Sequence, residues 1–151
     1  RMGWRSGSLR EMLDRRDIRE RVHLTGFVED RYLPALLTMA DLMAYPSLYE
    51  GFGLPVVEAM ACGTPVLTSS VSSLPEAAGG AAVLVDPSSV EDIADKLLEL
   101  AEDAGLRAAL TEKGLTRVSK LSWEMTARKT LQIYNRVLVE NTVVRHKKRK
   151  D

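Results

Sequence analysis

The sequence predicts an α/β fold, with a doubly wound parallel sheet and a helical C-terminal third. Short apolar runs alternate with longer segments in which apolar residues recur at helical spacing, which is the pattern of β-α-β units. The short runs are apolar at successive positions rather than at every second one, as expected for strands that helices cover on both faces. After residue 88 only helical spacing remains.

The first two thirds of the chain hold the predicted strands and the helices that connect them. Strands are expected over residues 22–25, 42–45, 65–68 and 82–85, and helices over 8–16, 31–40 and 56–62, with a short one near Leu74. Pro55 suits the first position of a helix, and Gly63 suits its end. The chain opens on a helix where such sheets normally open on a strand, so we expect the sequence to begin within a domain.

The C-terminal third predicts three helices. Ser89 is the expected N-cap of the first, with Asp92 three residues later as in a capping box, and Gly105 separates it from the second, over 106–120. Ser122 should cap the last helix, whose apolar stripe we assign to core packing: Trp123, Ala127, Leu131, Tyr134 and Leu138. Residues 142–151 show no period, and we expect a mobile basic tail after a domain of residues 1–141.

Composition excludes several classes of protein. Lys and Arg number 21, as do Asp and Glu, and a net charge of zero argues against a nucleic-acid partner. This net charge of zero is the sum of +4 over residues 142–151 and −4 over residues 1–141. One cysteine excludes an internal disulfide, and the two histidines form no ligand pattern with it, so no metal site is predicted. Without a membrane-spanning stretch or a visible signal peptide, a cytoplasmic protein is expected.

Ligands of open parallel sheets bind beyond the carboxyl ends of the strands. Two such junctions stand out, Thr25 to Val28 and Pro46 to Pro55. In the second, Gly51 and Gly53 precede a predicted helix, so the backbone can approach a ligand closely. The N–H groups of residues 51–54 and 56 should point out of the helix start and, with the helix dipole, form a site for phosphate.

Two acidic residues accompany this predicted phosphate site. Glu50 lies in the loop, and Glu58 lies about one turn into the helix. Carboxylates repel phosphate, so they are better suited to accept hydrogen bonds from hydroxyl groups. A ligand with phosphate in the middle and a polyol at each end fits both features. A nucleotide sugar is such a molecule.

The stretch from Ser47 to Val66 resembles the E-x7-E region of retaining glycosyltransferases of the GT-B fold, and more closely the group-1 (family 4) enzymes. The resemblance extends over most of the chain, including residues 22–28, 68–87 and the pair Ser122-Trp123. It implies the Rossmann-like C-terminal, donor-binding domain of such an enzyme. The stretch from Glu50 to Pro87 favours members that transfer mannose or glucose in polysaccharide synthesis.

The resemblance also implies a role for each site residue. Glu50 would be the catalytic residue, facing the donor hexose, and Glu58 would hydrogen-bond the ribose. The turn Gly26, Phe27 and Val28 would line the base pocket. The backbone of four residues would hold the sugar hydroxyls and the diphosphate: Gly51, Phe52, Gly53 and Leu54. Members of this family generally use no bound metal or cofactor, and transfer rests on electrostatic stabilisation of the departing diphosphate.

The resemblance is incomplete in two respects. Nothing in residues 1–21 matches the Arg and Lys with which the family neutralises the diphosphate, and the N-terminal acceptor-binding domain is absent. We therefore expect this chain alone to be inactive in transfer. One alternative is a catalytically inactive nucleotide-binding or scaffold module that pairs with another chain. An oxidoreductase is disfavoured because no G-x-G-x-x-G motif follows a strand.

The basic tail, residues 142–151, has three interpretations. It is a solubilising end, a contact to an anionic membrane surface, or a nucleic-acid contact. The second would place the protein on the inner face of the membrane through a weak peripheral attachment. The first is favoured, because a short charged run is usually a solvated segment.

Overall fold

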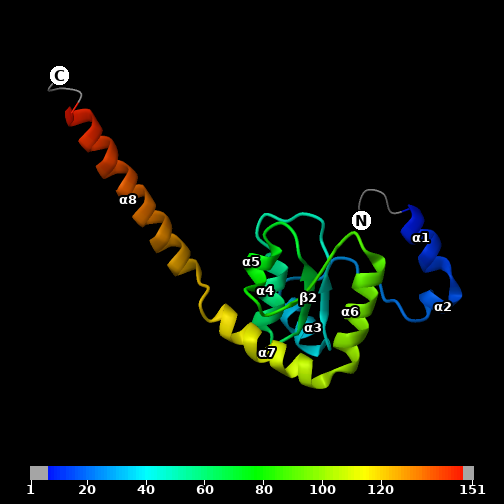
Figure 1. The fold of residues 1–151 in the computed structure, drawn as a ribbon. Helices are drawn as coiled ribbons and strands as arrows, with labels where there is room; N and C mark the ends of the chain where they lie inside the picture. The colour runs from blue at the N-terminus through cyan, green and yellow to red at the C-terminus, as the bar shows by residue number, and fades with distance from the viewer. Residues whose placement is uncertain (1–6, 148–151) are drawn as a thin grey trace. The chain divides into compact units, whose positions relative to one another are not determined.

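A computed structural model describes the backbone of residues 7–147 and the side chains of residues 11–138. The chain divides into two compact units, Arg1–Ala35 and Leu36–Asp151, and each is described by itself. Both units are drawn in Figure 1. Among the described residues, no helix is long and apolar enough to cross a membrane.

The first unit contains two short helices and no strand among its described residues. Helices α1 (Gly7–Asp14) and α2 (Arg16–Arg19) replace the single helix expected over 8–16. The strand expected over 22–25 is wrong: this segment belongs to no sheet, and its apolar residues Val22 and Leu24 are 40% and 63% exposed. A strand needs a neighbour for its backbone hydrogen bonds, and no described segment pairs with this one.

The second unit is built on a parallel three-stranded sheet. Its strands are β1 (Met43–Tyr45), β2 (Val66–Ser69) and β3 (Val83–Val85), in the spatial order β1-β2-β3. The connecting helices are α4 (Leu54–Ala61) and α5 (Leu74–Ala78), and α3 (Leu33–Met39), whose first three residues belong to the first unit, precedes the sheet. These elements confirm the predicted alternation of strands and helices, apart from the first strand.

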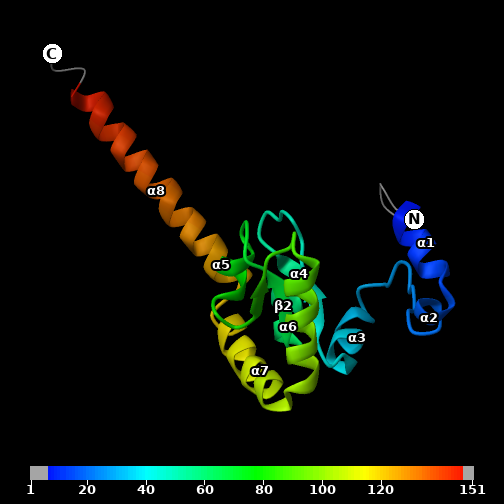
Figure 2. The ribbon, with the colours of Figure 1, turned by 45° about the vertical axis from the view of Figure 1, so that its right-hand side comes forward.

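Helices cover both faces of the sheet, as the continuous apolar strands predicted. Neighbouring residues of β2 point to opposite faces, Val66 into one buried cluster and Leu67 into the other. The first cluster contains Val56 and Met60 of α4, together with Leu74 of α5. The second contains Leu100 of α6 (Val90–Glu102) and Leu110 of α7 (Ala104–Val118). Figure 1 shows α4 and α6 on opposite sides of β2, and in the turned view of Figure 2 α6 lies in front of β2.

The caps of α6 and α7 are set by acidic and hydroxyl side chains. Ser89 caps α6 as predicted, because its Oγ accepts the N–H of Asp92 at 3.1 Å. Gly105 does not separate the two helices; it lies within α7. Asp103 is the break, since its carboxylate accepts the N–H of Leu106 at 2.8 Å and caps α7.

Helix α8 (Trp123–Lys147) corrects two expectations. Ser122 caps it as predicted, with its Oγ accepting the N–H of Met125 at 3.0 Å. Its apolar stripe does not pack in the core, since Trp123, Leu131, Tyr134 and Leu138 are all more than half exposed. The helix also continues through 142–147, where we expected an irregular tail. The remainder of that tail, 148–151, lies outside the described residues, so its membrane contact stays a prediction.

Candidate functional site

The candidate site is the loop between β1 and α4, residues 46–53, at the carboxyl end of β1. A second loop, residues 70–73, follows β2 and lies beside it. Hydroxyl groups at the end of β2 bind β1 and the first loop: Thr68 donates to the carbonyl of Tyr45 at 2.9 Å, and Ser69 donates to the carbonyl of Ser47 at 2.5 Å. Parallel strands bring these ends to one edge of the sheet, where ligands of such folds bind.

The carboxylate of Glu50 is held by two hydroxyl groups. Tyr45, the last residue of β1, donates its hydroxyl to Oε1 of Glu50 at 2.6 Å, and Ser47 donates to the same oxygen at 3.0 Å. Oε2 receives no hydrogen bond from any residue that the structure describes. The hydrogen bond to Glu50 raises the pKa of the Tyr45 hydroxyl above its ordinary value, and desolvation adds to the shift.

The backbone of Glu50 is held as firmly as its side chain. Its N–H donates to Oγ of Ser72 at 3.2 Å, and the same hydroxyl donates back to the Glu50 carbonyl at 2.7 Å. Ser73 donates to that carbonyl as well, at 2.9 Å. Ser72 has a φ of 60°, and it is the only non-glycine residue with positive φ among those described. Such strain persists where the surrounding contacts demand it.

The backbone after Glu50 presents unpaired donors. The N–H groups of residues 51–54 have no hydrogen-bond acceptor within the described part of the chain. The N–H of Val56, which we expected in this group, is instead bonded to the carbonyl of Gly53 at 3.0 Å. Gly53 takes a φ of 100° and caps α4, where an added Cβ would lie 2.7 Å from Leu74 Cδ2. The four remaining amides at a helix start can bind an anion.

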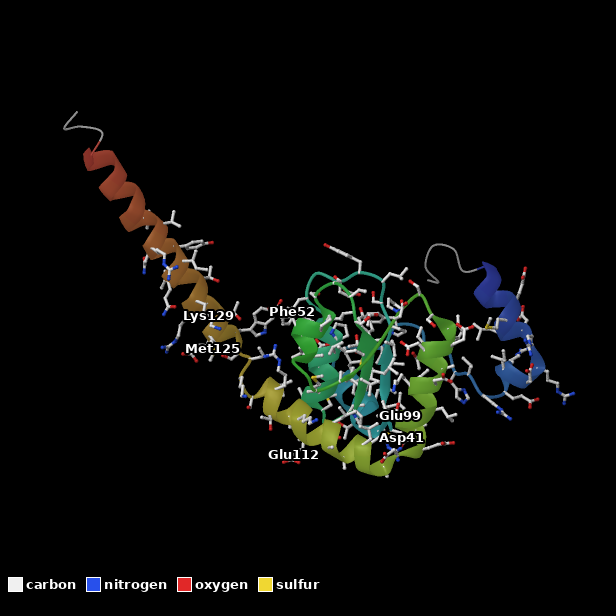
Figure 3. The ribbon with its side chains drawn as sticks, in the orientation of Figure 1. Asp41, Phe52, Glu99, Glu112, Met125 and Lys129 are labelled. Carbon is white, nitrogen blue, oxygen red and sulfur yellow. The ribbon has the colours of Figure 1, made fainter. Side chains whose placement is uncertain are left out.

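Side chains of this loop and helix are exposed around the amides. Phe52 is 39% exposed and Leu54 47%, and Figure 3 shows where Phe52 stands in the loop. Glu58 lies on α4 with its side chain exposed, and its carboxylate makes no hydrogen bond or ion pair with any described residue. The structure therefore places the predicted residues 50–53 in one loop and Leu54 at the start of α4, and it leaves the Glu58 carboxylate available to solvent.

The third predicted group lies in the other unit. Gly26, Phe27 and Val28 belong to the first unit, and Phe27 is 88% exposed. Their part in a base pocket stays a prediction. Among the described residues, no group of three or more His, Cys, Asp and Glu side chains lies together. The only cysteine, Cys62, is half-buried.

Sequence reasoning missed the residues that hold Glu50. Tyr45, Ser47, Ser72 and Ser73 supply every hydrogen bond that Glu50 makes to a side chain in the described region. One signal was visible in the sequence: five of the six residues from Thr68 to Ser73 carry hydroxyl groups, directly after a predicted strand. Hydroxyl side chains at such a junction commonly bind neighbouring backbone groups.

Comparison with known proteins places this chain in a family. The family of glycosyl transferases group 1 matches residues 4–117. O-antigen chain mannosyltransferase B of Escherichia coli is 39% identical over 132 residues, covering 87% of this chain and 35% of its own length. The chain thus spans about a third of this relative.

Solved structures share the fold. Sucrose-phosphate synthase from Thermosynechococcus elongatus superimposes with a TM-score of 0.75 at 30% identity, covering 87% of this chain and 34% of its own. HepE of Anabaena, solved in complex with UDP, superimposes with a TM-score of 0.73 at 26% identity, covering 86% of this chain and 36% of its own.

Proposed function

The chain belongs to the group 1 glycosyl transferases and has the Rossmann-like fold of a GT-B C-terminal domain, and from this premise we propose that it binds a nucleoside-diphosphate sugar. The donor is the substrate of a retaining, metal-independent hexosyltransferase, with mannose or glucose as the transferred sugar. A mannosyltransferase among the relatives supports the sugar, and UDP in the HepE structure supports a nucleotide ligand.

The observation that carries this proposal is the run of four unpaired amides directly after Glu50. Residues 51–54 offer their N–H groups at the start of α4, where the helix dipole adds positive potential. A diphosphate placed there accepts these hydrogen bonds without a side-chain cation. Because negative charge grows on the diphosphate as it departs, the same amides stabilise the transition state more than the ground state.

The two acidic residues suit the two neutral ends of such a ligand. Oε2 of Glu50 accepts a hydrogen bond from a hydroxyl group of the hexose. The negative charge of the carboxylate stabilises the positive charge that the sugar acquires as its bond to the diphosphate breaks. Glu58, exposed on α4, accepts hydroxyl groups of the ribose. Gly26, Phe27 and Val28 line the base pocket in this proposal. A separate part of the proposal is a weak peripheral attachment to the membrane through the basic tail, residues 142–151.

Donor binding is proposed for this chain, and sugar transfer for a longer protein. This chain spans about a third of the mannosyltransferase that it resembles. We therefore propose donor binding for this chain, and transfer to a saccharide or lipid-linked acceptor for a protein that also carries an acceptor-binding domain. The chain alone should show no transfer with a nucleotide sugar and a saccharide acceptor, and detected product would contradict this.

Thermal unfolding of the chain tests donor binding. GDP-mannose or UDP-glucose should raise the unfolding midpoint, because a ligand of the folded state stabilises it by mass action. Glu58→Ala should weaken this binding about tenfold or more, the scale of lost hydrogen bonds to a charged group. Glu112→Ala, on the exposed outer side of α7 (Figure 3), is the matched control and should bind as the wild type does. No shift with either nucleotide sugar at millimolar concentration would refute donor binding.

A further inference from the structure

We propose that Tyr45 is a positioning residue, whose hydroxyl sets which oxygen of Glu50 meets the donor sugar; this inference rests on the proposed function. The Tyr45 hydroxyl donates to Oε1 of Glu50 at 2.6 Å, the shorter of the two hydrogen bonds to that carboxylate. Tyr45 does not touch the sugar in this arrangement. It acts through Glu50.

Two hydroxyl groups bind the same oxygen of the Glu50 carboxylate, so its two oxygens have different surroundings. A carboxylate oxygen has about two lone-pair sites, and the hydroxyls of Tyr45 and Ser47 occupy both on Oε1. Oε2 has no protein donor among the described residues. The carboxylate therefore presents one oxygen to a ligand, and a sugar hydroxyl meets Oε2.

The two hydroxyl donors are not equivalent. The Ser47 hydroxyl has a second acceptor, the carbonyl of Tyr49 at 3.3 Å, and its single hydrogen is shared between the two. The Tyr45 hydroxyl has no acceptor other than Glu50 in the described part of the chain. Tyr45 also stands on β1, and its aromatic ring has few rotatable bonds. Tyr45 is therefore the principal holder of the carboxylate.

Other residues hold the backbone of Glu50, so Tyr45 is needed only to orient the Glu50 side chain. Ser72 and Ser73 hold the N–H and the carbonyl of Glu50, so the Cα position does not depend on Tyr45. Without the Tyr45 hydroxyl, the carboxylate stays in the loop and samples more orientations. Affinity for the sugar part of the ligand should fall, and affinity for the nucleoside diphosphate should not.

The experiment compares two ligands on each variant by calorimetry. For wild type, UDP-glucose and GDP-mannose are measured against UDP and GDP, and the affinity ratio of sugar to nucleotide reports the sugar contact alone. Tyr45→Phe should lower this ratio about fivefold to tenfold, the equivalent of one hydrogen bond. Tyr49→Phe is the control, because Tyr49 is 80% exposed and its hydroxyl holds nothing among the described residues. Ser47→Ala should give a smaller loss in the same direction, and it tests the inference if Tyr45→Phe does not fold.

The double variant separates positioning from a general structural effect. If Tyr45 acts through Glu50, Tyr45→Phe should cause no further loss in a Glu50→Ala background. An unchanged ratio in Tyr45→Phe, or an equal loss with and without Glu50, overturns the inference while the proposed function stands. An unchanged ratio in Glu50→Ala refutes the proposed sugar contact of Glu50, and with it the role of Tyr45.

Discussion

Glu50 and Glu58 lie eight positions apart and are held in opposite ways. Glu50 stands in a loop and takes part in five hydrogen bonds with four hydroxyl side chains: Tyr45, Ser47, Ser72 and Ser73. The side chain of Glu58 makes none with the described residues and extends from α4 into solvent. A helix fixes the position of Glu58 through its own backbone bonds, whereas the loop needs partners from a distant segment.

This difference determines what each substitution should change. The Glu50 loop depends on Ser72 and Ser73, which follow β2, so its geometry is a tertiary property. Changes to its anchors should alter both stability and sugar binding. Changes at Glu58 should alter binding only, because exposed surface positions contribute little to the free energy of unfolding.

The largest effect is expected at the junction of the loop and the helix. Gly53→Ala forces a side chain into a φ of 100° and places its Cβ 2.7 Å from Leu74, a fully buried side chain. Backbone strain and overpacking together should lower the free energy of unfolding by about 2 kcal/mol. Chemical denaturation of the unliganded chain measures this loss.

A matched control lies two residues away. Gly51→Ala meets no atom within 4 Å and has no positive φ, so its unfolding free energy should stay within about 0.5 kcal/mol of wild type. Equal losses in both variants would mean that the loop is not anchored at Gly53 as described.

A smaller effect is expected at Ser72. Ser72→Ala removes the hydroxyl that both accepts from and donates to the Glu50 backbone, and should cost about 1 kcal/mol of unfolding free energy. Ser72→Gly loses the same bonds but relieves the strain of a φ of 60°, so it should be more stable than Ser72→Ala by about 1 kcal/mol. Denaturation of the two variants side by side measures the difference. Equal stabilities would show that the strained backbone of Ser72 costs nothing.

Much of the fold was predictable because local patterns determine it. The apolar runs and helical stripes correctly indicated β1, β2 and β3 and the helices between them. The stripes of α6 and α8 look alike in sequence, yet Leu97 of α6 packs against the buried cluster around Leu67, whereas Leu131 of α8 is 58% exposed. Periodicity tells which face of a helix is apolar. It does not tell whether anything packs there, and it misled us at residues 22–25 for the same reason.

The groups of the candidate site that would bind a ligand were predictable from the sequence, whereas the residues that hold Glu50 in place were not. Glycines, acids and a helix start within one stretch indicated the amides of residues 51–54. The partners of Glu50 could not be derived, because Ser72 lies 22 positions away and meets Glu50 only when β1 and β2 pair. A contact between distant positions depends on strand register, which single-sequence patterns do not report.

The smallest effect is expected at alkaline pH and involves only the loop. The folded chain raises the pKa of Tyr45 above its ordinary value near 10, first through the hydrogen bond to Glu50. The folded state therefore holds this proton more tightly than the unfolded state. Its contribution to stability is fully present below pH 10 and is lost as the pH rises through the folded pKa.

Two variants sharpen this prediction. Tyr45→Phe should lose stability less steeply than wild type above pH 10, because the titrating hydroxyl is gone. Glu50→Gln should bring the pKa of Tyr45 back towards its ordinary value, since the neutral amide lacks the charge that favours the protonated hydroxyl.

Near-ultraviolet absorbance of tyrosinate measures the titration, with Tyr45→Phe used to subtract the other three tyrosines. Glu58→Gln is the control: the Glu58 side chain makes no hydrogen bond with Tyr45 and is not among the causes of its raised pKa, so the titration should match that of wild type. If Glu58→Gln shifted the curve as much as Glu50→Gln, the contact between Tyr45 and Glu50 would not be what sets this pKa.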